Sequence, residues 1–138
     1  LEKVTWFGRG PHENYPDRQA GAALGRYTGT VGELAVPYLL PQENGARNET
    51  RWVELRGASG RGLRVSGDEP FSFSALPYSA EQLWLARHAC ELQQEEHIYL
   101  CVDSRQRGLG SASCGPDTLP QYEVPAGEYR FSVRLRAV

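Results

Sequence analysis

The chain has 138 residues and a formal net charge of −2, with 40% hydrophobic and 23% charged residues. This length predicts one domain with a buried core, and the composition excludes a largely disordered chain. The near-neutral charge disfavours a basic nucleic-acid-binding protein. The longest apolar run, AVPYLLP, contains two prolines and is too short to span a membrane. No signal peptide is predicted at the N-terminus.

Cysteine usage indicates a reducing compartment. The chain has three cysteines, an odd number, and they form no CxxC motif. This pattern argues against a disulfide framework and against a zinc site. We therefore expect free thiols in a cytoplasmic protein.

The N-terminal third predicts short extended segments joined by loops. Alternation in EKVTWF, residues 2–7, predicts a strand with Val4 and Trp6 on one face. The following GRGPHENYPDR, residues 8–18, is dense in turn-forming residues and predicts a loop. A further strand is expected at 25–30.

The next segments carry turn and strand signals. Residues 34–41 should be extended but outside a central strand, because they contain two prolines. The Asn-Gly dipeptide of ENGAR, residues 43–47, predicts a turn with positive φ. TRWVELR, residues 50–56, predicts a strand whose inward face is ambiguous. Two further strands are expected, at 63–66 and 71–76.

The C-terminal half predicts one short helix and two more strands. Ser79 can cap a helix, and Gln82 would complete a capping box. HIYLCVD, residues 97–103, predicts a buried strand, and residues 104–120 form a long loop of small residues. GEYRFSVRLR, residues 127–136, alternates cleanly and predicts a final strand. Its apolar side chains should face the core: Tyr129, Phe131, Val133 and Leu135.

Seven to nine short strands with one short helix predict an all-β fold, a β-sandwich.

Few residues in the sequence are candidates for catalysis or for binding a metal or a sugar. The three histidines lack metal-binding spacing, and Cys114 has no adjacent base that would make it a nucleophile. Trp6, Trp52 and Trp84 could form sugar-stacking platforms, but their positions in strand and helix patterns favour core packing.

Four segments, in order, carry a family resemblance. They are WFGRGPHENYPDR (6–18), VPYLLPQENGARNETRWVEL (36–55), CVDSRQRGLGSASCGP (101–116) and PAGEYRFSVRL (125–135). Together they resemble the C-terminal domain of β-galactosidases of glycoside hydrolase family 2. The resemblance implies that residues 1–138 are the later half of a galactose-mutarotase-like supersandwich domain.

The resemblance also implies a role within a larger enzyme. Such enzymes hydrolyse terminal non-reducing β-D-galactose residues with retention, using two glutamates on a separate (β/α) barrel. No catalytic residue is therefore expected in this chain, and it should hold no metal or cofactor, since the Mg²⁺ and Na⁺ that the full enzymes often use bind mostly elsewhere. The expected partners are the rest of the enzyme, the galactoside and further copies in a homo-oligomer.

The resemblance assigns the 104–120 loop to the wall of the active site. Ser113 and Cys114 match a Ser-Trp pair of some members, so both are expected to line the substrate pocket. The 8–18 loop is expected to be a rigid scaffold, with Asp17 and Arg18 pairing or bonding local backbone. The alternative is a stand-alone carbohydrate-binding module, with sugar platforms among four aromatic residues: Trp6, Trp52, Trp84 and Tyr99.

Overall fold

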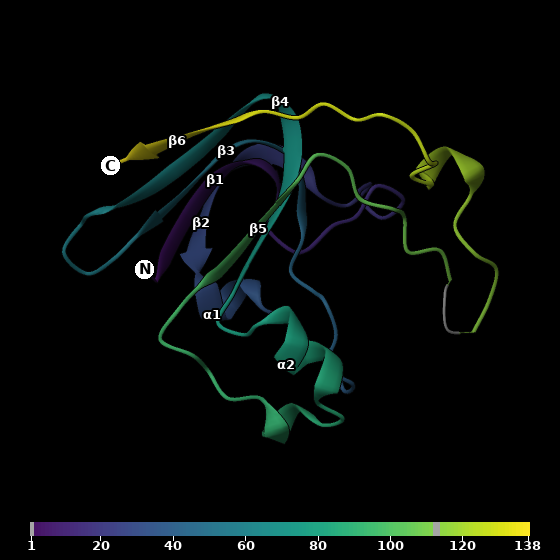
Figure 1. Cartoon of the computed structure of the whole chain (residues 1–138), viewed down its shortest axis with the longest axis horizontal. Helices are drawn as coiled ribbons and strands as arrows, with labels where there is room; N and C mark the ends of the chain where they lie inside the picture. Colours follow the sequence, from purple (N-terminus) through teal and green to yellow (C-terminus); the bar gives the residue numbers. More distant parts are fainter. Residues whose placement is uncertain (1, 112–113) are drawn as a thin grey trace.

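A computed structural model describes residues 2–111 and 114–138, and these form a six-stranded antiparallel sheet (Figure 1). The strands are β1 (Lys3–Gly10), β2 (Ala23–Thr30), β3 (Arg47–Arg56), β4 (Gly62–Leu76), β5 (Tyr99–Asp103) and β6 (Val133–Ala137). Their order is β2-β1-β3-β4-β5, and β6 also pairs with β4. The expected all-β class is confirmed, and the described residues supply one sheet of a sandwich-like domain.

Strand β4 is central to the sheet because it pairs with two different strands, β6 and β5, along the same edge. Its first half pairs with β6, with Gly67 opposite Val133. Its second half pairs with β5, with Ser72 opposite Asp103. Figure 1 shows β4 bending between these halves. The sequence predicted two strands here, but the backbone stays extended across the polar residues between them, and a single strand of 15 residues results.

The core lies on one face of the sheet and beneath a short helix, α1 (Val31–Leu34). Trp6 of β1 packs edge-on against Phe73 of β4, with ring centroids 5.9 Å apart. Val53 of β3 is fully buried, which settles the face that the sequence left ambiguous. Trp52 points to the opposite face, where the Arg64 guanidinium lies 4.1 Å from its ring centre.

Both α-helices begin at a residue whose side chain accepts a hydrogen bond from a backbone N–H of the first turn. Thr30 accepts a hydrogen bond from Glu33 N, and the Glu33 side chain bonds the Thr30 backbone N–H, so α1 starts with a complete capping box. The sequence analysis missed this helix, because it has only four residues and no apolar periodicity. Helix α2 (Ala80–Leu85) is capped by Ser79 as predicted. The Gln82 side-chain oxygen instead accepts a hydrogen bond from the Gln93 N–H at 3.1 Å, so the predicted second half of that box is wrong.

Two 3₁₀ turns complete the secondary structure: η1 (Ala89–Glu91) and η2 (Pro120–Tyr122). None of the helices in the described residues is long and apolar enough to cross a membrane.

The predicted burial of the last strands is wrong. Strand β5 is only half-buried, and the strand expected at 127–136 shortens to β6, all of whose residues are exposed. The four side chains expected to face the core are between 38% and 64% exposed, and Trp84 is 86% exposed. The physical reason is that, within the described residues, no second sheet covers them.

Replacing Phe73 by Ala should lower the free energy of unfolding by about 3–5 kcal/mol, because a fully buried ring is removed from the core. Chemical denaturation of the purified variant measures this. The matched control is Phe131→Ala, at a ring that is 39% exposed, which should cost about 1 kcal/mol or less. Equal losses at the two positions would contradict the placement of the core.

Candidate functional site

The two motif segments 13–18 and 43–48 meet in a buried polar junction. The Asn14 backbone N–H donates to the Ala46 carbonyl at 2.8 Å. Asn48 donates from its backbone N–H to Asn14 Oδ1 at 2.9 Å, and from Nδ2 to the Asn14 carbonyl at 3.1 Å. Both asparagines are buried. Buried polar groups that are fully paired fix a unique geometry, so this junction holds the 8–18 segment against the start of β3.

Two buried charged side chains of the described chain, Glu13 and Arg47, lie within the same junction and form no direct ion pair with each other. Glu13 accepts a hydrogen bond from the Gly45 N–H at 2.9 Å, and Arg47 lies on the face of the Trp6 ring. Arg47 also donates to three carbonyls, those of Pro11, Leu34 and Gly45. Burial lowers the pKa of Arg47 to about 10, against the opposing attraction of Glu13. The guanidinium therefore remains charged at neutral pH.

The predicted turn at Asn44-Gly45 is confirmed, with a φ of 77° at Gly45. A Cβ on Gly45 would lie 2.9 Å from the Leu34 carbonyl oxygen. Glycine is therefore required twice here, for the left-handed backbone and for the close approach of α1.

Asp17 carries the most specific contact between distant segments. Its Oδ1 accepts from the Leu109 N–H at 3.0 Å, and its Oδ2 accepts from the Gly110 N–H at 2.7 Å and the Thr118 hydroxyl at 3.0 Å. We call these three bonds the Asp17 clamp. The sequence analysis expected Asp17 to act locally. The structure instead shows it binding a loop more than 90 residues further along the chain.

The backbone of the loop fits the carboxylate closely. A Cβ on Gly108 would lie 2.7 Å from the Asp17 carboxyl carbon and 2.4 Å from Thr118 Oγ1, and Gly110 has a φ of 63°. Desolvation acts to raise the pKa of Asp17, but the clamp bonds outweigh it and lower the pKa below its ordinary value of 3.8. The carboxylate is thus the form that the loop recognises.

The described residues on either side of positions 112–113 in the 104–120 loop run away from the sheet (Figure 1). The Ser111 N–H donates to the Pro116 carbonyl at 3.0 Å, and the Cys114 N–H donates to the Ser111 carbonyl at 3.2 Å. Cys114 is exposed, and Ser113 lies outside the described residues. The structure therefore presents Cys114 at the surface of a clamped loop.

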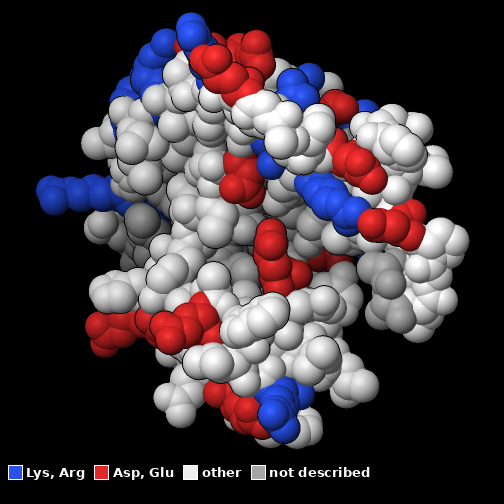
Figure 2. Space-filling view, turned by 45° about the vertical axis from the view of Figure 1, so that its right-hand side comes forward, with Lys and Arg blue, Asp and Glu red and all other residues white. Residues whose placement is uncertain are grey.

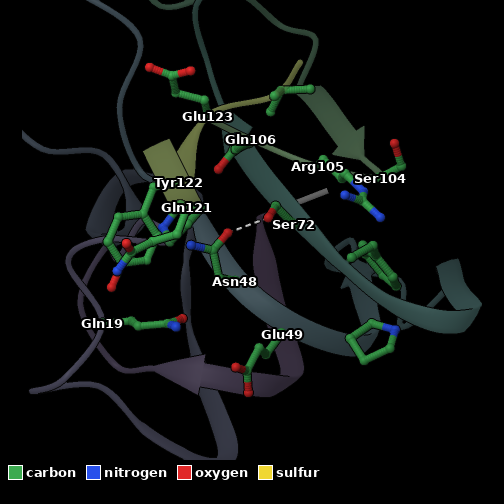
Figure 3. A pocket seen from close by; sticks show the side chains of 14 residues that line it. Gln19, Asn48, Glu49, Ser72, Ser104, Arg105, Gln106, Gln121, Tyr122 and Glu123 are labelled. Atoms are coloured by element: carbon green, nitrogen blue, oxygen red, sulfur yellow. Dashed lines mark hydrogen bonds between the residues drawn. The ribbon is translucent and has the colours of Figure 1, made fainter. Parts of the chain in front are cut away.

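A polar cavity of about 300 Å³ lies at the root of this loop (Figure 3). Its walls come from the 11–22 connection, the start of β3, the middle of β4 and both stems of the loop. Asn48 joins Ser72 by a hydrogen bond on one wall. The sequence analysis did not identify this cavity, since its lining residues are scattered in the chain and share no motif.

The four aromatic residues proposed as sugar platforms do not line this cavity. Trp6 is buried in the core, and Trp52 is half-buried beneath Arg64. The Tyr99 hydroxyl donates to Glu95 at 2.6 Å. Trp84 is exposed on α2.

Neither the distribution of surface charge nor the arrangement of possible metal ligands identifies a binding site. Acidic and basic side chains are interspersed over the face shown in Figure 2. Across residues 2–111 and 114–138, no group of three or more His, Cys, Asp or Glu side chains could hold a metal ion.

Comparison with known proteins identifies related sequences along the whole chain. A family model described as the β-galactosidase small chain matches residues 1–135. A β-galactosidase of Vibrio cholerae is 42% identical over 134 residues, covering 96% of this chain and 12% of the relative. A β-galactosidase of Arthrobacter sp. strain B7 is 37% identical over 142 residues, covering 99% and 14%. The chain therefore spans only a small part of these relatives.

Replacing Asp17 by Asn should loosen the 104–120 loop, because an amide cannot accept two backbone N–H bonds with the strength of a carboxylate. Hydrogen exchange of the Leu109 and Gly110 amides should accelerate about tenfold or more. The matched control is Asp68→Asn, since Asp68 makes only exposed contacts with Ser132 and Arg134. Unchanged exchange in the Asp17 variant would contradict the clamp.

The clamp should also depend on pH. Because the folded pKa of Asp17 lies below the ordinary value of 3.8, its contribution is complete above that value and is lost as pH falls through the folded pKa. The NMR shifts of the Leu109 and Gly110 amide protons should therefore be constant at neutral pH and move together only at strongly acidic pH. Titration of these protons near neutral pH would be the contrary result.

Proposed function

The chain belongs to the β-galactosidase small-chain family, and on this basis we propose that it works as a non-catalytic C-terminal β-sandwich domain of a longer β-galactosidase. The longer enzyme would hydrolyse terminal non-reducing β-D-galactose residues with retention, and its catalytic carboxylates would lie outside this chain. The family membership supports the enzyme class. The small share of each relative that the chain covers supports its role as one part of a larger protein.

The described carboxylates fit a non-catalytic role. A glycosidase acid needs a raised pKa. Among the described carboxyl groups with a shifted pKa, the shift is downward in each case: Asp17, Glu33, Glu91, Glu95 and Asp117. Glu49 and Glu123 line the cavity, but neither is buried, and Glu49 accepts a hydrogen bond from Arg9 at 3.2 Å.

The Asp17 clamp is the observation that carries the proposed role of the loop. A loop meant to wall a neighbouring pocket must hold its shape without support from its own sheet, and the clamp supplies that support at Leu109, Gly110 and Thr118. Cys114 then stands exposed at the tip, where Cys114 and Ser113 would line the substrate pocket of the whole enzyme.

Exposed apolar side chains support a docking role for the rest of the domain. Leu39 is 94% exposed, and Trp84, Leu85 and Leu135 are each more than 60% exposed. We expect the remainder of the enzyme, or a second subunit in a homo-oligomer, to cover them.

The aromatic-platform version of a stand-alone sugar-binding module has weaker support. Trp6 is inaccessible in the core, and Trp52 is covered on its ring face by an arginine. The two remaining candidates, Tyr99 and Trp84, lie on different elements. We therefore favour the enzyme-domain proposal.

Removing residues 109–115 from the full-length enzyme should change its kinetics, because the deletion takes away the proposed wall and two clamp donors. We expect kcat/KM for a chromogenic β-galactoside to fall about tenfold or more, roughly 1.4 kcal/mol of transition-state stabilisation. The control replaces Gln93 and Gln94 by Ala in an exposed connection far from the clamp in sequence, and should leave the kinetics unchanged.

The chain on its own should show no turnover in the same assay. Robust activity of the chain alone would contradict the placement of the catalytic groups elsewhere. Unchanged kinetics of the deletion variant would leave the domain with a supporting role only.

A further inference from the structure

We propose that the outer face of the sheet, the face opposite the core, docks against segment 79–96 of a second copy of this chain. The outer face is basic and the segment is acidic, and each also exposes apolar side chains. The inference goes beyond the proposed function, because it assigns an interface between copies. It depends on charge and exposure, and it holds whether or not the longer protein is a β-galactosidase.

Strand pairing brings cationic side chains together on the outer face. Arg26 of β2 lies in the same row as Trp52 of β3 and Arg134 of β6, and Arg64 pairs with Arg136 in the next row. The guanidinium carbons of Arg26 and Arg64 lie 5.6 Å and 4.1 Å from the Trp52 ring centre. We call this surface the basic face, with the members Lys3, Phe7, Arg26, Trp52, Arg56, Arg64, Arg134 and Arg136.

The basic face has more positive charge than its acidic neighbours neutralise. Glu54 is shared between Arg56 and Arg64, at 2.6 Å and 3.7 Å. Asp68 pairs with Arg134 at 3.4 Å. Within the described chain, no ion pair neutralises the remaining cations, which are Lys3, Arg26 and Arg136. Because complementary charge gives an interface its specificity, this excess favours an acidic partner.

The same chain carries a surface of the opposite charge. On segment 79–96, which we call the acidic lobe, a hollow of about 580 Å³ is lined by Glu81, Glu91 and Glu95 and by the apolar side chain of Leu85. A hydrogen bond from His88 lowers the pKa of Glu91, so this carboxylate is charged at neutral pH. An arginine can place its guanidinium among such carboxylates and its apolar stem along a leucine.

Apolar side chains on both surfaces can supply the affinity that exposed charges do not. Exposed ion pairs contribute little individually, whereas tryptophan and arginine dominate the energetics of interfaces. Trp84 is largely exposed on the acidic lobe, and the basic face presents the half-buried rings of Phe7 and Trp52. The two surfaces therefore match in apolar character as well as in charge.

A second copy fits this arrangement better than a polyanion does. The net charge of −2 disfavours a nucleic acid or an anionic membrane as the occupant. The basic face includes the start of β4, whereas the acidic lobe follows its other end at Leu76, and Figure 1 shows α2 below the sheet. Because each copy carries both surfaces, a twofold pair can form the contact twice and so close the assembly.

The test uses the intact enzyme that contains this chain, with sedimentation velocity at a series of protein concentrations as the readout. Arg26→Glu on the basic face and Glu81→Arg on the acidic lobe should each raise the dissociation constant of the assembly about tenfold or more, because like charges then meet. Trp84→Ala should weaken assembly to a similar extent. An equimolar mixture of the two charge variants should associate as the parent does, since in a mixed pair each surface again meets its opposite charge.

The matched controls are Arg130→Glu and Glu128→Arg, which make the same charge changes at an exposed ion pair outside both surfaces. They should leave assembly unchanged. A monomeric parent, unchanged assembly of the charge variants, or a mixture that stays dissociated would overturn the proposal. So would a lower melting temperature with unchanged assembly, which would show that the rest of the longer protein covers the basic face. Turnover is not a readout, so a failure of the β-galactosidase proposal leaves the result interpretable.

Discussion

The polar junction between residues 13–14 and 44–48 is the contact on which the site depends. A charged guanidinium and two asparagine side chains are stable in a low-dielectric interior only when their hydrogen bonds are met. The two terminal nitrogens of Arg47 donate to carbonyls from three separate segments, although its Nε is left without a partner among the described atoms. Asn14 is paired with both Ala46 and Asn48. Any displacement of one segment would leave buried polar groups unpaired in the others. The junction therefore fixes the backbone of the 8–18 loop more firmly than apolar packing alone would.

Asp17 extends that rigidity to the other end of the chain. It follows the buried junction by three residues, so its carboxylate stands in a defined place at the edge of the sheet. There it accepts hydrogen bonds from two backbone N–H groups and one hydroxyl of the 104–120 loop. Gly108 allows the close approach, and Gly110 allows the backbone turn. In this way the clamp fixes Leu109, Gly110 and Thr118 in a loop of small residues that has no core of its own.

The strands of the N-terminal half could be predicted because the patterns that indicate them lie within a few consecutive residues. Alternation placed Val4 and Trp6 on one face, which the structure shows to be the buried one, and the Asn-Gly pair placed the turn at 43–47. The exposure of Phe131 and Leu135 could not be predicted, since alternation reports two faces but not whether a second layer covers one of them. Ser113 and Cys114 came from resemblance alone. The Asp17 clamp and the cavity at the root of the loop had no local signal, because their members are far apart in the chain.

The clamp also has a consequence for the order of folding. Its partners are separated by 92 to 101 residues, so the chain entropy of closing that interval must be overcome before these bonds contribute. Native pairs with such long sequence separation form late, after nearer contacts have brought the ends together. The loop is then ordered only on a finished sheet, and it belongs among the segments that open first in native-state fluctuations. A nascent chain would therefore complete its sheet before the clamped part of the 104–120 loop takes its shape.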